Sequence, residues 1–175
     1  ATPRSHILAV LCILCYVLIG PALAHADSLG PNLIQNPSFE TGSTAPVGWL
    51  KGGYSVNTRS FTYPAAPAHS GSRAAQVSIT SYVSGDAKWY FPSVSVAAGA
   101  TYRFSDWYQS SVPSEVDAQV THTNGSVSYI VLGNPSPSTS YTSFSAEFAV
   151  PKDAASITIF HVIARIGTMA VDDYA

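Results

Sequence analysis

The sequence predicts an all-β protein built as a two-sheet antiparallel β-sandwich. Short runs of alternating apolar and polar residues recur along the chain, and turn residues separate them about every ten residues. No segment shows a sustained apolar stripe with the period of a helix, so little helix is expected. The abundance of Ser, Thr, Tyr, Gly, Ala and Val also suits many short strands.

The first expected strands can be read in order from this alternation. In residues 73–82, Ala75, Val77 and Ile79 alternate with polar residues and predict a strand with one buried face. Residues 94–96 predict a second strand, which ends at a turn over residues 97–100. The alternation then resumes over residues 102–104.

A hairpin is expected next, because residues 116–121 alternate and are followed by the turn sequence Asn124-Gly125. The remaining expected strands are residues 129–132, 144–150, 157–163 and 169–174. Two stretches rich in Pro and Ser, residues 62–72 and 133–142, are expected to be loops within one domain.

Residues 1–26 have the pattern of a cleavable export signal. Arg4 and His6 give a weakly basic start, residues 7–19 are apolar, and Ala24-His25-Ala26 is a small-x-small cleavage pattern. The alternative is a membrane anchor, but the apolar run is shorter than the roughly 20 residues that a span needs. We therefore expect a secreted protein with one domain over residues 27–175. The chain ends on a strand-like segment with no polar tail, which suggests the front part of a longer protein.

Composition excludes several kinds of site. Cys12 and Cys15 are the only cysteines and both lie in the export signal, so the mature domain has no disulfide, cysteine metal site or cysteine nucleophile. Charged residues make up 10% of the chain and the net charge is −2. No basic patch suggests nucleic acid as a partner, and no basic amphipathic helix suggests a lipid surface.

Two short acidic signatures stand at opposite ends of the expected domain, one ending in Glu40 and the other containing Asp172 and Asp173. Each places a carboxylate beside strand-forming apolar residues in a chain that has little charge. This placement suggests a domain whose two ends are tied together around a hard cation.

These signatures belong to a longer series of motifs. The series is Asn32-Leu33-Ile34, Asn36-Pro37-Ser38-Phe39-Glu40, Gly48-Trp49, His69-Ser70-Gly71-Ser72-Arg73-Ala74, Gly99-x-Thr101-Tyr102-x-Phe104-Ser105 and Val171-Asp172-Asp173. Its order and spacing resemble the carbohydrate-binding-module type of galactose-binding-like jelly roll. Residues 87–91 and 104–108 look more narrowly like the module that precedes secreted bacterial polysaccharide deacetylase domains.

The resemblance implies a structural calcium ion. When the family's ligand positions are carried over to the matching motifs, the side chains of Glu40 and Asp172 would be ligands. Backbone carbonyls of Ser38 and of the Ser70-Gly71 turn would complete the site. Calcium accepts six to eight oxygen ligands of these types. The alternative is that both carboxylates only accept hydrogen bonds from turn backbone, and Asp173 is a weaker ligand candidate than Asp172.

A sugar site needs flat aromatic faces and planar polar groups. If Tyr102 and Phe104 point into the core, alternation places Arg103, Trp107 and Gln109 on the opposite face of the same strand. The next expected strand, residues 116–121, could lie alongside with Asp117 and Gln119 on its polar face. Trp89 and Tyr90 are candidates for a stacking edge, and the Pro92-Ser93 interruption leaves their facing open. Tyr54 and Tyr129 are loop or edge candidates. The expected ligand-binding residues are Arg103, Trp107, Gln109, Asp117, Gln119, Trp89 and Tyr54. The alternative for each tryptophan is the core, and Trp49 is expected to be structural.

Catalysis is not expected from this chain. Glu40, Glu115 and Glu147 are the only glutamates, and the three histidines beyond the export signal are not paired as in deacetylase metal sites. The sequence also has no Gly-x-Ser-x-Gly nucleophile elbow. The leading hypothesis is a secreted, non-catalytic carbohydrate-binding module that targets an enzyme to a polysaccharide. The alternatives are the non-catalytic front of a polysaccharide deacetylase or glycoside hydrolase, and a surface adhesion sandwich that binds no sugar.

Overall fold

The structure is a computed structural model that describes residues 30–175, and within this range it contains strands and no helix. No helix among these residues is therefore long and apolar enough to cross a membrane. The expected export signal, residues 1–26, lies outside the described residues. The strands are β1 (Leu50–Tyr54), β2 (Asn57–Ala65), β3 (Ala74–Tyr82), β4 (Asp86–Tyr90), β5 (Val94–Ser95), β6 (Thr101–Ser110), β7 (Glu115–His122), β8 (Val127–Gly133), β9 (Ser138–Ala149), β10 (Ala154–Val162) and β11 (Gly167–Asp172).

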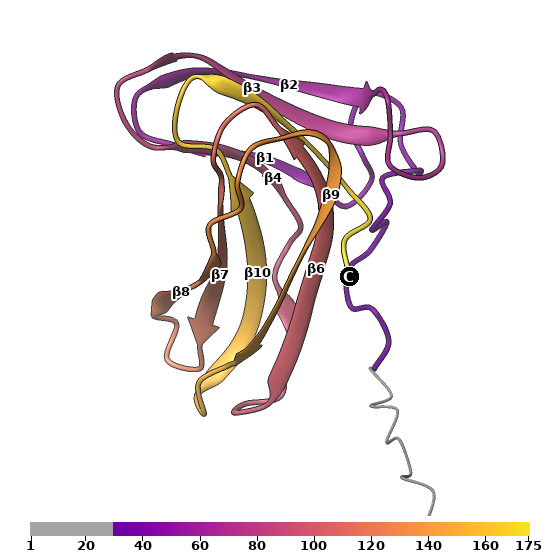
Figure 1. The fold of residues 1–175 in the computed structure, drawn as a ribbon. Coiled ribbons are helices and arrows are strands. Elements are labelled where there is room, and N and C mark those ends of the chain that lie inside the picture. The colour runs from indigo at the N-terminus through magenta and orange to yellow at the C-terminus, as the bar shows by residue number, and fades with distance from the viewer. Residues whose placement is uncertain (1–29) are drawn as a thin grey trace, which may run out of the picture. The chain divides into compact units, whose positions relative to one another are not determined.

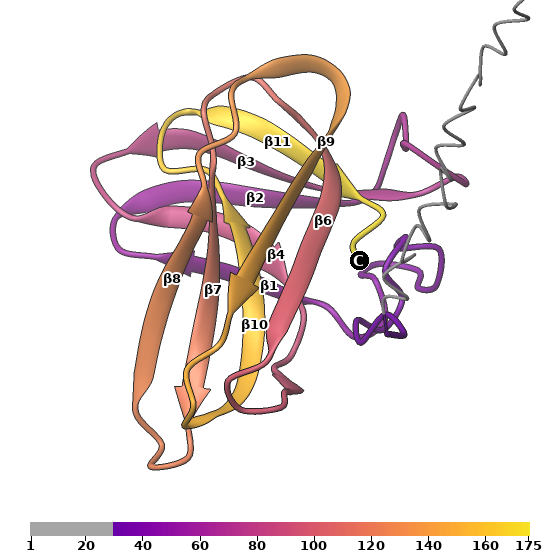
Figure 2. The same ribbon diagram turned by 60° about the horizontal axis from the view of Figure 1, so that its bottom comes forward.

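The strands form two antiparallel layers, which confirms the predicted sandwich. One is a five-stranded sheet in the order β2-β3-β11-β6-β9. The other has the order β5-β10-β7-β8, and a bridge between Ala87 and Ile163 attaches the β1-β4 pair to the end of β10. We call the strands β1, β4, β10, β7 and β8 the composite sheet. Figures 1 and 2 show β8, β7 and β10 side by side in it.

Alternation along the strands fills the core between the layers. Phe104 and Tyr108 of β6 point inward from the five-stranded sheet, and Val116, Ala118 and Val120 of β7 point inward from the composite sheet. On β10, Ile159 lies opposite Ala118 and belongs to the same buried layer. The central strands β6, β7 and β10 therefore each place apolar side chains in the core and keep an outer face.

The two ends of the domain lie side by side, as Figure 1 shows for the C-terminus and the indigo segment. The backbone N–H of Tyr174 donates to Pro37, and the Asn32 side chain donates to the carbonyl of Tyr174. The Tyr174 ring lies 4.8 Å from that of Trp49 and 5.8 Å from that of Phe39. Trp49 is buried in this cluster and its structural role is confirmed.

Some strand positions were not predicted. β1 and β4 carry no clear apolar alternation, and β2 extends to Ala65 through a stretch expected to be a loop. β9 likewise begins at Ser138, inside the second expected loop. β2 and β9 are edge strands of the five-stranded sheet, where one side of the backbone is unpaired and polar residues and Pro64 are tolerated.

Candidate functional site

The predicted orientation of β6 is confirmed. Phe104 and Tyr108 are buried, while Arg103, Trp107 and Gln109 lie on the outer face of the five-stranded sheet. This arrangement follows from the two-residue period of a strand that buries one face.

The expectation that β6 and β7 form one ligand groove is wrong. Asp117 and Gln119 do lie on the outer face of β7, because Val116, Ala118 and Val120 fill the core. However, β7 belongs to the composite sheet and β6 to the five-stranded sheet, so their outer faces point to opposite sides of the sandwich. Alternation fixes which residues share a face of one strand, but it does not fix the sheet that the next strand joins.

Trp89 is a core residue and not a ligand platform, which corrects a second expectation. Only 1% of it is exposed, and its indole N–H donates to the carbonyl of Gln76 at 2.9 Å. Its ring packs edge-on against Phe61 with centroids 5.3 Å apart. Tyr54, by contrast, is exposed at the end of β1.

Trp107 lies on an outer face, but a neighbouring ring covers it. The His69 ring stacks on Trp107 with centroids 3.7 Å apart and an interplanar angle of 12°. His69 is held there by its Nδ1, which lies 2.6 Å from Asp173 Oδ2. One face of the indole is therefore already used within the domain.

The outer face of the composite sheet carries a cluster of aromatic rings that the sequence did not reveal. We call Tyr90, Phe160 and Tyr129, from β4, β10 and β8, the aromatic row. The Phe160 ring lies 5.3 Å from the Tyr90 ring and 6.5 Å from the Tyr129 ring. Phe160 pairs with Asp117 in the ladder, whereas its neighbour Ile159 faces the core.

Polar groups surround the aromatic row. The Lys88 ammonium lies 4.5 Å from the centroid of the Phe160 ring and 2.6 Å from Asp86 Oδ1. The Gln119 amide donates to the hydroxyl of Tyr129 at 2.8 Å. These groups present a charged donor, a carboxamide and a phenol around rings that pack edge-on or tilted against one another.

Asp117 stands out among these polar groups. Its Oδ1 is buried and accepts no hydrogen bond. Burial, followed by the neighbouring carboxyl of Glu115, raises the pKa of Asp117 to about 7. The side chain is therefore an acceptor without a donor, on the face that also carries the rings.

A glycine makes room for one of the rings. A Cβ at Gly52 would lie 2.9 Å from the Tyr90 ring and 3.2 Å from Lys88. The adjacent Gly53 is covered by the Arg59 guanidinium, which also donates to the carbonyl of Asp86 at 3.0 Å. The two glycines of β1 thus allow larger side chains of β4 and β2 to lie across the strand.

Sequence reasoning missed Phe160 and Lys88 as site residues and left open which way Tyr90 faces. Phe160 stands in residues 157–163, where the neighbours Ile159 and Phe160, and then Val162 and Ile163, place apolar side chains on both faces, so alternation does not show which face is buried. The aromatic segment 87–91 offered a weak signal, but its facing depends on pairing with β1 and β10. Asp117, Gln119 and the edge residue Tyr129, which the sequence did indicate as candidates, lie on this same face.

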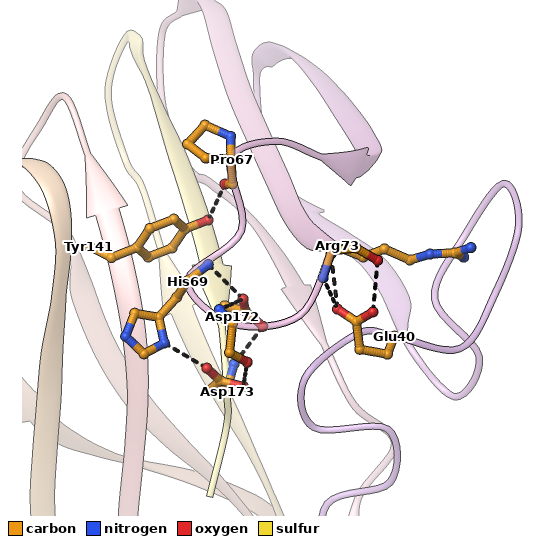
Figure 3. A network of polar contacts seen from close by, with 9 residues as sticks. Glu40, Pro67, His69, Arg73, Tyr141, Asp172 and Asp173 are labelled. Atoms are coloured by element: carbon orange, nitrogen blue, oxygen red, sulfur yellow. Dashed lines mark hydrogen bonds and ion pairs between the residues drawn. The ribbon is translucent and has the colours of Figure 1, made fainter.

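The structure brings the side chains of both expected carboxylate ligands, Glu40 and Asp172, against one loop, residues 69–73, as Figure 3 shows. Glu40 Oε1 accepts the backbone N–H groups of Ser72 and Arg73, both at 2.9 Å. Asp172 Oδ2 accepts those of His69 and Ser70, at 2.9 and 3.1 Å. The loop over residues 69–73 therefore connects the two acidic signatures.

The electrostatics of the two aspartates in this network differ. Asp172 is fully buried, and this burial raises its pKa to about 6 although backbone N–H groups oppose the shift. Burial also acts on Asp173, but hydrogen bonds from His69, Ser38 and Ser70 lower its pKa below the usual range. Within residues 30–175 no three His, Cys, Asp or Glu side chains are grouped to hold a metal.

A buried serine–histidine–aspartate chain crosses the core. His161 Nδ1 lies 2.6 Å from Asp106 Oδ2, and His161 Nε2 lies 2.8 Å from Ser114 Oγ. Asp106 and His161 are fully buried, and Ser114 is 6% exposed. A nucleophile must reach its substrate, so this enclosed chain is a structural link between the layers and not an active site.

Comparisons with known proteins agree with this fold. A family model described as "Carbohydrate binding domain" matches residues 31–164, which is more than half of the chain. No curated protein matches this chain. The fold is similar to the CBM22-1 xylan-binding domain of Xyn10C from Paenibacillus barcinonensis, with a TM-score of 0.59 and 14% identity over 78% of this chain and 88% of that chain.

Two further structures have the same fold. The C-terminal family 22 carbohydrate-binding module of Xyn10B from Clostridium thermocellum has a TM-score of 0.59 and 15% identity over 83% of this chain and 94% of that chain. The enzymatically active domain of tailspike protein 4 from bacteriophage CBA120 has a TM-score of 0.61 and 15% identity over 82% of this chain. This chain spans only 21% of the tailspike chain.

Proposed function

Because this chain belongs to the carbohydrate binding domain family, whose members are non-catalytic binding modules, we propose that it binds a polysaccharide through the outer face of the composite sheet. The aromatic row carries this proposal. Its two tyrosine rings, which Phe160 supports from between them, offer apolar faces for the C–H side of sugar rings, and the neighbouring polar groups can hydrogen-bond sugar hydroxyls.

The unpartnered carboxyl oxygen of Asp117 supports the same proposal. A buried acceptor without a donor carries a desolvation cost of about 1–3 kcal/mol. A ligand hydroxyl would relieve this cost once the side chains that cover the oxygen move aside on binding. Lys88 and Gln119 add donors on either side of Phe160.

The width of the face favours a polymer over a single sugar. Neighbouring strands lie about 4.8 Å apart, so the face extends about 19 Å from β1 to β8. Leu50 and Tyr54 lie exposed on β1 and Tyr129 on β8. A ligand that contacts both edges must therefore contain several sugar units.

We further propose the finer parts of this function. The module would be secreted and would hold an attached or partner enzyme near its polymer, and the sequence likeness makes a polysaccharide deacetylase one candidate. Xylan is a reasonable first ligand to test, because two of the similar structures are described as xylan-binding domains.

A structural calcium ion is a separate proposal. Glu40 and Asp172 would supply carboxylate ligands, and Ser38, Ser70 and Gly71 would supply backbone carbonyls. The environment of Asp172 supports the calcium proposal. Its carboxylate is fully buried and contacts no basic side chain in the described part of the chain. Burial raises its pKa, and a bound cation would counter this shift by stabilising the charged form. The ion would add a cationic link between the two ends of the domain.

The test of the sugar-binding face compares two substitutions on opposite faces. Tyr90→Ala should weaken binding to xylan or another bound polysaccharide by tenfold or more, as expected for a lost aromatic anchor. Arg103→Ala, on the outer face of the five-stranded sheet, should leave the affinity unchanged. Affinity electrophoresis across a set of polysaccharides gives both values, and thermal melting checks that each variant is folded. The opposite pattern would reject the proposed face.

A further inference from the structure

A hollow of about 290 Å³ lies on the outer face of the five-stranded sheet, on the side of the sandwich away from the aromatic row. It extends across all strands of that sheet. Its lining consists of Ala65, Ala66, Pro67, Gln76, Gln109, Ser111, Ser138, Thr139, Thr168 and Ala170.

The floor is a row of three residues on adjacent strands. Ala170 of β11 pairs with Gln76 of β3 on one side and with Gln109 of β6 on the other. A small methyl group therefore lies between two carboxamides, and each carboxamide offers both donors and an acceptor. This spacing suits a ligand that has a flat apolar face and polar groups at its two edges.

The walls come from segments far apart in the sequence. The hydroxyl of Tyr141 on β9 donates to the carbonyl of Pro67 after β2, at 3.1 Å, and so joins the two edges of the sheet (Figure 3). The Gln109 side chain donates to the carbonyl of Thr139 at 2.8 Å, which fixes its orientation. Both contacts order the hollow without a ligand.

The lining combines apolar surface with uncharged polar groups and contains no charged side chain. Hydroxyls of Ser111, Ser138, Thr139 and Thr168 accompany the two carboxamides. A charged ligand group would lose its water here without gaining an opposite charge. The volume lies just below the range of drug-sized pockets, so a single small ring matches it.

We propose that this hollow is a second carbohydrate site, which binds one neutral sugar ring and acts independently of the aromatic row. The ring would lie over Ala170, and the carboxamides of Gln76 and Gln109 would bind its hydroxyls from both edges. This site does not depend on the polysaccharide site proposed above.

Nuclear magnetic resonance of the ¹⁵N-labelled chain titrated with D-xylose and D-galactose tests the proposal. The backbone amides of Gln76, Gln109 and Ala170 should shift with a Kd on the order of 1 mM for at least one sugar. Gln76→Ala should weaken that binding about tenfold, and Ala170→Leu should abolish it by filling the floor. Ser145→Ala, an exposed substitution on β9 outside the hollow, should have no effect.

Two further measurements distinguish this site from the polysaccharide site. Tyr90→Ala should leave the sugar-induced shifts in the hollow intact even where it abolishes polysaccharide binding. D-Glucuronate, which is charged, should produce much weaker shifts than D-xylose. An absence of shifts with either neutral sugar, or shifts that survive Ala170→Leu, would overturn the proposal.

Discussion

At the scale of single residues, the proposed sugar face depends on a few side chains whose neighbours change their chemistry. Lys88 is 9% exposed, yet it is stabilised by the ion pair with Asp86 and by the Phe160 ring. Asp117 has no such counter-charge in direct contact, and the nearby Glu115 disfavours its ionised form. The face therefore holds a lysine close to a carboxyl group whose pKa is about 7, so that about half of it carries a proton at neutral pH.

The protonation of Asp117 predicts a pH dependence of stability. Its pKa is about 7 in the folded chain and has an ordinary value of 3.8, so the folded state binds a proton that the unfolded state has released. This contribution is complete below about pH 4, and it is lost as the pH rises to about 7. Asp117→Asn should therefore reduce the fall in melting temperature between about pH 4 and about pH 8.

Melting curves of both proteins over this range measure the effect. Asp172, whose pKa is also raised, contributes with the same sign but is present in both proteins, so the difference isolates Asp117. Identical pH profiles for the two proteins would contradict the assignment.

At the scale of elements, the loop between β2 and β3 joins the two ends of the domain. Gly71 in this loop has a φ of +59°, and a Cβ there would lie 2.4 Å from Glu40 Oε1. The loop can therefore approach Glu40 only because this position lacks a side chain. The same loop contacts Asp172 at the end of β11, so one short segment orders both termini.

Calcium should stabilise this junction if the proposed ion binds there. At about 100 times Kd, an ion that binds only the folded state adds roughly 2.7 kcal/mol to the free energy of unfolding. We expect EDTA to lower the melting temperature and added calcium to restore it. Glu40→Ala and Asp172→Ala should each remove this response, whereas Glu147→Ala on β9 should retain it.

Differential scanning calorimetry and elemental analysis make the two measurements. A melting temperature that EDTA and calcium leave unchanged, together with no bound metal, would show that the two carboxylates only order the turn backbone.

At the scale of the whole molecule, polar contacts inside the core join the two layers. Asp106 comes from β6 of the five-stranded sheet and His161 from β10 of the composite sheet. Ser114 extends the chain to the segment before β7, and Tyr108 packs against the His161 ring at 5.0 Å. The pair therefore adds a directional contact to an interface that is otherwise apolar.

Removing one member of this pair should be costly. His161→Ala would leave the Asp106 carboxylate buried without its partner, and we expect it to lower the free energy of unfolding by about 3–5 kcal/mol. Ser114→Ala removes one hydrogen bond at the end of the chain and should cost about 1 kcal/mol. Urea denaturation of both variants measures the difference, and a similar small loss in each would mean that the pair does not link the layers.

The sequence by itself determined the all-β class, the positions of most strands and the inward or outward direction of residues on β6 and β7. These properties are local, because a two-residue period and a turn motif depend only on neighbours along the chain. It also identified Glu40 and Asp172 as partners in one junction, through their motifs.

Only the tertiary structure decided which strands share a sheet. It separated Trp107 from Asp117, buried Trp89 and brought Tyr90, Phe160 and Tyr129 into one row. It also assembled Gln76, Ala170 and Gln109 into the floor of the hollow. The physical reason is that strand pairing joins residues far apart in the chain, and an alternating pattern is compatible with either layer of a sandwich.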